Sequence, residues 1–282
     1  MTVPVRSIFL SDSHLGQKLA RGDELLAFLK EFQPEHLYLV GDFVDAWCLR
    51  WNWHWPASYT GIIDRLIELQ SRGTVIRYTP GNHDSFLRRP IPKISGVTIA
   101  DEFIHETVDR RRLLVVHGDL FDSIERNWKW LSRVGSFLFN RVIDVNLGLN
   151  VVLRKFHRRP VYFSFWIKRT SKRMLGAFGR FQRKLIKAAR DRGVDGIICG
   201  HVHFPQIRQE GSIAYINTGD WLENASALIE HFDGSLELIN HGKTIASLPA
   251  QTPSPNSTAP NQRNARGSNR DVVPTAPSLE KT

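Results

Sequence analysis

The stretch Thr79-Pro80-Gly81-Asn82-His83-Asp84 directly follows an apolar segment, residues 75–78, that has the composition of a β-strand. A Pro-Gly pair is typical of a turn. The turn therefore presents an amide oxygen, an imidazole and a carboxylate at the end of a predicted strand. Groups of these three kinds can bind a metal ion or transfer a proton.

The same order of an apolar strand and then a polar loop recurs along the chain. The strands predicted to end in such loops cover residues 5–10, 36–40, 75–78, 112–116 and 194–199. Helical periodicity over residues 23–32 and 58–70 separates the first three of these strands. Strands that alternate with helices indicate parallel pairing, and ligands of such sheets collect at the carboxyl ends of the strands. We therefore expect the loops to converge.

The later part of the chain predicts antiparallel strands. Residues 213–216 are apolar, and residues 225–231 and 236–239 flank a turn at Asp233-Gly234. We expect two packed sheets flanked by helices, within one domain that covers residues 1–250. Residues 251–282 contain five prolines and no aromatic side chain, which predicts a disordered tail.

The formal net charge of +10 is concentrated in one segment. Residues 124–192 contain 18 Lys and Arg against 3 Asp and Glu, a net of +15, so the remainder carries 10 − 15 = −5. The same segment is rich in Trp and Phe, and we interpret residues 123–192 as a basic helical insert that forms a lid. This composition favours an anionic, lipid-linked phosphorylated substrate and peripheral membrane contact through residues 124–192. Binding of nucleic acid is the alternative.

The compartment is predicted from what the sequence lacks. Two distant cysteines, Cys48 and Cys199, indicate neither a disulfide framework nor a zinc ribbon. The first residues show no signal-peptide pattern, and the longest apolar region, residues 136–153, is interrupted by charged residues. We expect a cytoplasmic protein that contacts a membrane from its surface.

The candidate chemistry is the sum of five loops. Their candidate residues are Asp12, His14, Asp42, Asn82, His83, Asp84, His117, His201 and His203. Carboxylates, imidazoles and an amide oxygen without a thiolate suit Mn²⁺, Fe or Zn²⁺ better than a structural zinc. They are too many for one transition metal and suit two divalent metals that share a bridging carboxylate, clamp a phosphoryl group and activate water. Each motif alone is a common turn, but five of them at five strand ends are not expected by chance.

In this order the motifs resemble those of the calcineurin-like metallophosphoesterases: D-x-H, G-D-x-x-D, G-N-H-[DE], H and G-H-x-H. Here they are Asp12-Ser13-His14, Gly41 to Asp45, Gly81 to Asp84, His117 and Gly200 to His203. The resemblance implies a four-layer α/β/β/α sandwich that carries the basic insert. It implies one metal held by Asp12, His14, Asp42 and His203, and a second held by Asp42, Asn82, His117 and His201. It also implies that His83 protonates or stabilises the leaving group and that Asp84 orients His83.

Within that family the chain resembles the UDP-diacylglucosamine pyrophosphatase branch of lipid A synthesis, through residues 41–47, residues 217–221 and the insert. The best-known members of that branch have Arg where this sequence has His83. The resemblance implies hydrolysis of a pyrophosphate or phosphodiester bond in a lipid A precursor. A nuclease or cyclic-nucleotide phosphodiesterase of the same family, and a non-catalytic scaffold of that fold, are the alternatives.

Two features keep two interpretations each. Asp45 can cap the following segment or support a metal-ligating imidazole. The four tryptophans at positions 47, 51, 53 and 55 can form a wall of the substrate pocket or pack in the core beneath it.

Overall fold

The computed structural model describes residues 2–89, 96–122 and 172–251, with the side chains of the third range beginning at residue 178. Two compact units make up the chain. The larger unit contains residues 1–118 and 185–282, and the smaller contains residues 119–184. Most of the predicted insert, and the predicted tail after residue 251, lie outside the described residues. The candidate site belongs entirely to the larger unit.

The first sheet of the larger unit has seven strands in the order β12-β11-β10-β1-β2-β3-β4. Their bounds are β1 Val3–Leu10, β2 Phe32–Val40, β3 Val75–Thr79, β4 Val97–Ile99, β10 Ser226–Glu230, β11 Leu236–Asn240 and β12 Lys243–Leu248. β1, β2, β3 and β4 pair in parallel, and β10, β11 and β12 continue the sheet as antiparallel strands. The predicted parallel and antiparallel parts therefore belong to one sheet.

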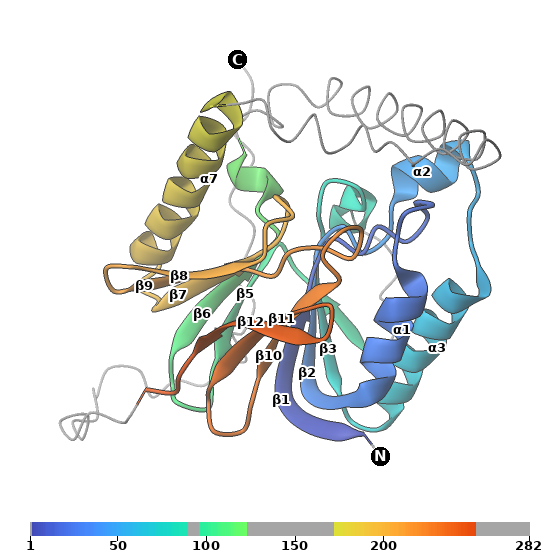
Figure 1. Ribbon diagram of the computed structural model, residues 1–282, viewed down its shortest axis with the longest axis horizontal. Helices are drawn as coiled ribbons and strands as arrows, with labels where there is room; N and C mark the ends of the chain where they lie inside the picture. The colour runs from blue at the N-terminus through green and yellow to red at the C-terminus, as the bar shows by residue number, and fades with distance from the viewer. Residues whose placement is uncertain (1, 90–95, 123–171, 252–282) are drawn as a thin grey trace, which may run out of the picture. The chain divides into compact units, whose positions relative to one another are not determined.

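Helices α1 (Gly22–Glu31) and α3 (Ala57–Ser71) lie side by side on one face of this sheet (Figure 1). The period of two along each strand decides which residues face them. Leu37 and Leu39 of β2 join α1 and α3 in one hydrophobic core, whereas Tyr38 and Val40 belong to a second core on the opposite face.

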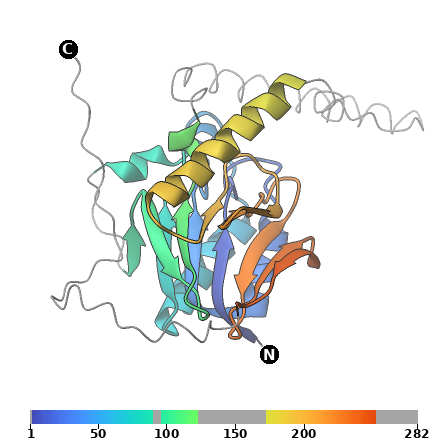
Figure 2. The ribbon, with the colours of Figure 1, turned by 90° about the vertical axis from the view of Figure 1, so that its left-hand side faces the viewer.

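The second core lies between the first sheet and a five-stranded sheet of order β5-β6-β7-β9-β8, seen from another side in Figure 2. Its strands are β5 Glu102–Glu106, β6 Arg112–Val116, β7 Gly196–Cys199, β8 Gln206–Glu210 and β9 Ile213–Asn217. β6, β7 and β9 are parallel, and β5 and β8 are antiparallel edge strands. The two sheets pack face to face, as predicted.

A polar cluster is buried between the two sheets. The carboxylate of Glu230 on β10 accepts a hydrogen bond from Ser7 Oγ (2.6 Å) and lies 2.7 Å from His105 Nε2 on β5. The other ring nitrogen of His105 lies 2.9 Å from the hydroxyl of Tyr38. The cluster therefore joins three strands of the first sheet to the second sheet.

The outer layer of the second sheet is the C-terminal end of α7 (Lys172–Asp191). Within the larger unit, Leu185 and Ala189 are fully buried. Arg190 donates to the backbone oxygen of Glu210 on one edge strand, and Arg192 forms an ion pair of 2.7 Å with Glu102 on the other. The predicted four-layer α/β/β/α fold is confirmed.

Several short elements were not predicted from the sequence. They are the helix α2 (Ala46–Trp51), the 3₁₀ turns η1 (Ser85–Arg88) and η2 (Asp119–Phe121), and the strands β4, β5, β8 and β12. In the described ranges, no helix has the length and apolar character required to cross a bilayer.

Candidate metal centre

Five strand ends of the larger unit place the predicted residues close together. β1, β2, β3, β6 and β7 end at Leu10, Val40, Thr79, Val116 and Cys199. Each predicted ligand lies within four residues beyond one of these ends. Because β1, β2 and β3 are parallel to one another, as are β6 and β7, the loops of each sheet emerge on one side. The contact of 2.9 Å between His117 Nδ1 and the carbonyl oxygen of Val40 joins the two sets of loops.

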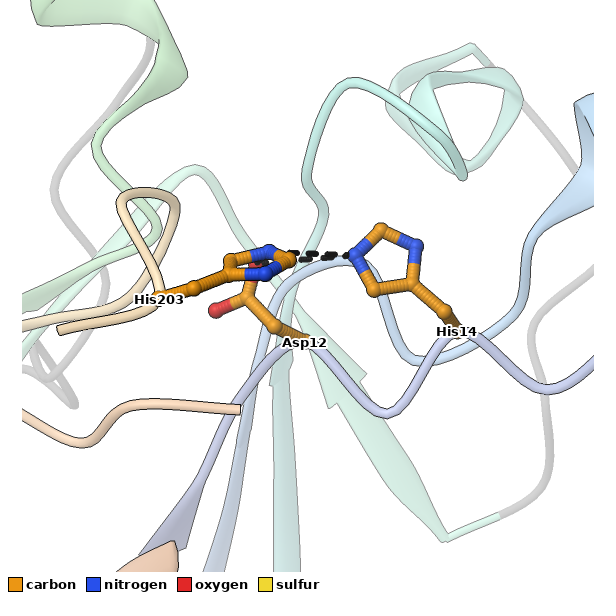
Figure 3. A group of neighbouring side chains, drawn as sticks. All are labelled: Asp12, His14 and His203. Atoms are coloured by element: carbon orange, nitrogen blue, oxygen red, sulfur yellow. Dashed lines mark hydrogen bonds and ion pairs between the residues drawn. The ribbon is translucent and has the colours of Figure 1, made fainter. Parts of the chain in front are cut away.

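Asp12, His14 and His203 form the first group of candidate ligands, shown in Figure 3. His203 Nε2 lies 3.1 Å from Asp12 Oδ1 and 3.3 Å from His14 Nε2. All three ligand atoms lie within 4.8 Å of one another. In Figure 3 the two imidazole rings approach each other from different loops, and the carboxylate of Asp12 lies beside the ring of His203. A single divalent cation could contact all three side chains.

Asp42 and His117 form the centre of a second group. His117 Nε2 lies 3.4 Å from Asp42 Oδ2 and 3.4 Å from Asn82 Oδ1, and its ring centroid is 5.2 Å from that of His201. Asp42 Oδ2 is also 3.9 Å from His14 Nε2 of the first group. The Asp42 carboxylate therefore lies between the two groups, where one residue could contact two cations.

The backbone at these positions is unusual. Five of the seven predicted ligands have positive φ, between 47° and 71°: Asp12, His14, Asp42, His201 and His203. Non-glycine residues adopt this region only when the surrounding structure enforces it, and such strain concentrates at functional sites. Backbone hydrogen bonds between loops supply part of that enforcement, such as those from His14 N to Asp42 O (2.8 Å) and from Asp12 N to Gly41 O (3.0 Å).

The glycines of the three G-containing motifs each lie against a candidate ligand. A Cβ added to Gly41 would lie 2.2 Å from His117 Nδ1, one on Gly81 2.2 Å from Asp42 Oδ1, and one on Gly200 2.4 Å from Asp12 Oδ2. No side chain fits at such distances. The close approach of the backbone to the ligands thus explains why glycine precedes Asp42, Asn82 and His201.

Backbone amides hold the two central carboxylates. His201 N donates to Asp12 Oδ2 (2.9 Å), and His83 N donates to Asp42 Oδ1 (2.7 Å). In each carboxylate the other oxygen is the one near the imidazoles. One oxygen of each carboxylate therefore fixes its position, and the other faces the candidate ligands.

The electrostatics of the site favour a cation. Burial alone would raise the pKa of Asp12, but the neighbouring His203 outweighs it and lowers that pKa to about 2. The pKa of Asp42 is likewise well below its usual value, because His117 and His83 outweigh the effect of burial. Two ionised carboxylates and several imidazole nitrogens in a buried site are a donor set that fits divalent metals of the first transition row.

Contacts of the Nδ1 atom orient two of the imidazole rings. His117 Nδ1 lies 2.9 Å from the carbonyl oxygen of Val40, and His14 Nδ1 lies 3.4 Å from Asp45 Oδ2. In both rings Nε2 then faces the centre. Such contacts fix the tautomer and direction of metal-ligating histidines.

Asp45 satisfies both interpretations given to it above. Its Oδ1 accepts a hydrogen bond from Cys48 N (2.8 Å) and so caps α2, while its Oδ2 lies 2.8 Å from His83 Nδ1. Gln17 Nε2 donates to the same Oδ2 (2.6 Å). Burial raises the pKa of Asp45, but the contacts with His14 and His83 dominate and hold that pKa far below its usual range. Gln17 was not predicted from the sequence, where its position three residues after His14 is its only signal.

The predicted pairing of Asp84 with His83 is wrong. The Asp84 carboxylate instead accepts hydrogen bonds from Gly81 N (2.6 Å), from Phe43 N (2.8 Å) and from the hydroxyl of Tyr78. Burial and the nearby Asp42 raise the pKa of Asp84 to about 6. Asp84 folds back over its own turn, so it holds the loops together, and Asp45 takes the place next to His83.

The four tryptophans do not act as one group. The ring of Trp47 lies over His83 with a centroid distance of 4.1 Å. Trp51 and Trp53 are 82% and 74% exposed, and Trp55 packs against the first core. Trp47 therefore belongs to the site, Trp55 belongs to the core, and the two between them are surface residues.

A family model for calcineurin-like phosphoesterases matches residues 5–205, which is more than half of the chain. The chain therefore belongs to the calcineurin-like phosphoesterase family, and it is a metal-dependent hydrolase, as the sequence motifs predicted.

The chain is also similar to individual proteins. The chain is 26% identical to the UDP-2,3-diacylglucosamine hydrolase of Aeromonas salmonicida, over 79% of this chain and 89% of that protein. The protein of the same name from Haemophilus influenzae is 23% identical over 79% of this chain and 94% of its own length. Among solved structures, the E. coli phosphoesterase Yfce aligns with 87% of this chain and 99% of its own, at 18% identity and a TM-score of 0.45.

Proposed function

We propose that this protein hydrolyses a pyrophosphate bond in a UDP-diacylglucosamine-like lipid A precursor, with two divalent metals, most suitably Mn²⁺. The observation that carries the proposal is the position of Asp42 between the two groups of candidate ligands. The names of the relatives support the substrate class.

The residues divide into two proposed metal sites. Asp12, His14 and His203 would hold one metal, His117, Asn82 and His201 the other, and Asp42 would contact both. When bound, the two metals would neutralise the charge of the phosphoryl oxygens and lower the pKa of water for attack on phosphorus. Carboxylate, imidazole and amide donors are compatible with Mn²⁺, Fe and Zn²⁺.

His83 is the proposed acid. Its Nδ1 lies at the ionised carboxylate of Asp45, and its amide, rather than its ring, holds Asp42. Nε2, on the opposite side of the ring, can then give a proton to the leaving phosphate oxygen as the anhydride bond breaks. The ring of Trp47 covers one face of the imidazole and limits its rotation.

Exposed apolar residues on the segments that follow the ligand-bearing strands support a lipid-linked substrate. They are Leu19, Trp51, Trp53, Phe86 and Phe204. They lie on the segments that follow β1, β2, β3 and β7. An ionic centre with apolar residues on its loops suits a molecule that joins phosphates to acyl chains. A phosphodiester without lipid would leave these apolar residues exposed to water.

We also infer that the protein binds peripherally to the cytoplasmic face of the inner membrane. The support is the charge of +15 on residues 124–192, most of which lie outside the described residues. Basic residues next to aromatic ones bind anionic lipid surfaces, and salt weakens this attraction.

One experiment tests both proposals. Anionic vesicles that contain UDP-diacylglucosamine are mixed with the Mn²⁺-loaded protein, and hydrolysis and sedimentation with the vesicles are measured at rising salt. A generic phosphodiester and single-stranded nucleic acid are compared as substrates. We expect preferred hydrolysis of the lipid-linked pyrophosphate and salt-sensitive sedimentation. Asp42→Ala should lower hydrolysis by more than about 100-fold, whereas Asp23→Ala, which removes an exposed carboxylate on α1, should not.

Other results would change the function. Faster hydrolysis of nucleic acid with a steep salt dependence would favour the nuclease alternative. Full activity after removal of metal would contradict the two-metal proposal. Absence of turnover on every substrate, together with absence of bound metal, would favour the scaffold.

A further inference from the structure

A sixth loop lies beside the candidate metal centre and contains none of the predicted ligands. We call it the clamp loop; it covers residues 217–224 and begins at the last residue of β9. Asn217, Thr218 and Asp220 are fully buried. Buried polar side chains are hydrogen-bonded, so their partners indicate what the loop does.

The clamp loop binds the backbone around Asp12. Trp221 N donates to the carbonyl oxygen of Asp12 (3.0 Å). The hydroxyls of Thr218 and Ser11 lie 2.7 Å apart, and Ser11 Oγ donates to Gly219 O (3.0 Å). The clamp loop therefore fixes the first candidate ligand from its backbone side.

The same loop binds the backbone around His203. The side-chain amide of Asn224 donates one hydrogen to the carbonyl oxygen of His203 (3.1 Å) and the other to the carboxylate of Asp220. Asp220 Oδ1 in turn accepts from Leu222 N (2.7 Å) and Glu223 N (2.6 Å). Asp220 thus shapes the turn that presents Asn224 to His203.

The two residues that the loop holds are strained and adjacent. Asp12 and His203 have φ of 53° and 52°, and their side chains approach to 3.1 Å. A left-handed backbone costs about 1–2 kcal/mol for a residue with a side chain. Each residue keeps this conformation only while its neighbours hold it, and both are bonded to one loop.

We propose that Asn224 and Asp220 are positioning residues that set the separation of Asp12 and His203, and thereby the affinity of the first group for its metal. The assignment rests on the proposed metal site. Neither side chain contacts a second-group residue in any hydrogen bond described above. Their loss should therefore weaken one of the two metal-binding steps and leave the other intact.

The assignment is tested by titrating Mn²⁺ into the metal-free full chain. Binding is measured by isothermal titration calorimetry and by the electron paramagnetic resonance signal of Mn²⁺. Asn224→Ala and Asn224→Asp both remove the amide donor to His203. We expect one of the two steps to weaken by about 10–100-fold and the other to stay within about twofold. Gln209→Ala is the matched control, because Gln209 Nε2 also donates to a backbone oxygen, that of Gly211 (3.0 Å), at an exposed turn.

Three results would overturn the assignment. The first is two unchanged Mn²⁺ steps in both Asn224 variants. The second is equal weakening of both steps with a lower Tm of the metal-free chain, since that identifies a general structural role. The third is absence of Mn²⁺ binding by the unchanged chain, which contradicts the proposed metal site itself. If the unchanged chain and the variants all bind Mn²⁺ equally well, only the positioning role of the clamp loop is contradicted.

Discussion

Asp45 connects the proposed acid to a candidate metal ligand, since its Oδ2 lies 2.8 Å from His83 Nδ1 and 3.4 Å from His14 Nδ1. A carboxylate beside an imidazole stabilises the protonated ring. Removing this charge while keeping the shape of the side chain therefore affects proton transfer more than substrate binding.

We expect Asp45→Asn to lower kcat by about 10–100-fold with little change in KM. The basic limb of the pH profile of kcat should move to lower pH, because the protonated imidazole loses its anionic partner. Steady-state kinetics between pH 5 and 10 measure both effects. In a His83→Ala background the same substitution should lower kcat by a much smaller factor. An equally large fall in kcat in the His83→Ala chain would show that Asp45 acts only through His14 or α2.

The sequence predicted which residues gather at the site better than it predicted their pairing. Asp45 and Asp84 follow ligand-bearing loops in similar positions, and spacing does not tell which carboxylate reaches His83. Which carboxylate pairs with His83 depends on how the loops fold in three dimensions. Asp84 turns back to its own loop, where Gly81 N, Phe43 N and Tyr78 supply its donors, and Asp45 reaches His83 from a neighbouring strand end.

Among the elements, the cluster of Ser7, His105 and Glu230 links β1, β5 and β10. Burial raises the pKa of Glu230, but hydrogen bonds from His105 and Ser7 dominate and lower it below 4.5. A carboxyl whose pKa is lower in the folded state stabilises the protein at pH values above its unfolded pKa. That contribution is lost as the pH falls through the folded pKa.

We therefore expect Glu230→Gln to lower the free energy of unfolding by about 1–3 kcal/mol at pH 7. The difference from the unchanged chain should shrink as the pH falls from the unfolded-state pKa of 4.5 through the lower pKa of the native carboxyl. Urea unfolding at pH 7, 5, 4 and 3 measures the effect. Parallel pH curves for the two proteins would contradict it.

The elements that sequence analysis missed are those with a weak local pattern. β12 is exposed along most of its length, and β8, Gln206–Glu210, is largely polar. Their pairing with β11 and β9 depends on neighbours that are already in place. α2 has six residues and no fully buried side chain, so no apolar periodicity marks it. The helices α1 and α3 and the strands β1 and β3 bury a regular face and were predicted close to their observed bounds, whereas Phe32, the first residue of β2, was predicted as helix.

The candidate ligands come from loops that span residues 12–203. An unfolded chain cannot bring these loops together, so a metal that binds them binds the folded state. Metal binding should therefore raise the free energy of unfolding of the whole fold.

We expect Mn²⁺ at about 100 times its Kd to stabilise the fold by about 2.7 kcal/mol. That corresponds to a rise in Tm of about 5–10 °C for a domain of this size. Calorimetric scans with Mn²⁺ and with excess chelator measure the shift. The Asp42→Ala chain should lose most of this rise in Tm. An equal Tm with and without metal would refute the link between metal binding and stability.

The backbone amides that hold Asp12 and Asp42 have a practical consequence. His201 and His83 donate to these carboxylates through their main chain, so exchanging either imidazole for a methyl group leaves the donors in place. A His83→Ala chain would then keep its ligand cage assembled while lacking its proton source. Such a chain is suited to capture an uncleaved substrate for crystallography and so to identify the natural one directly.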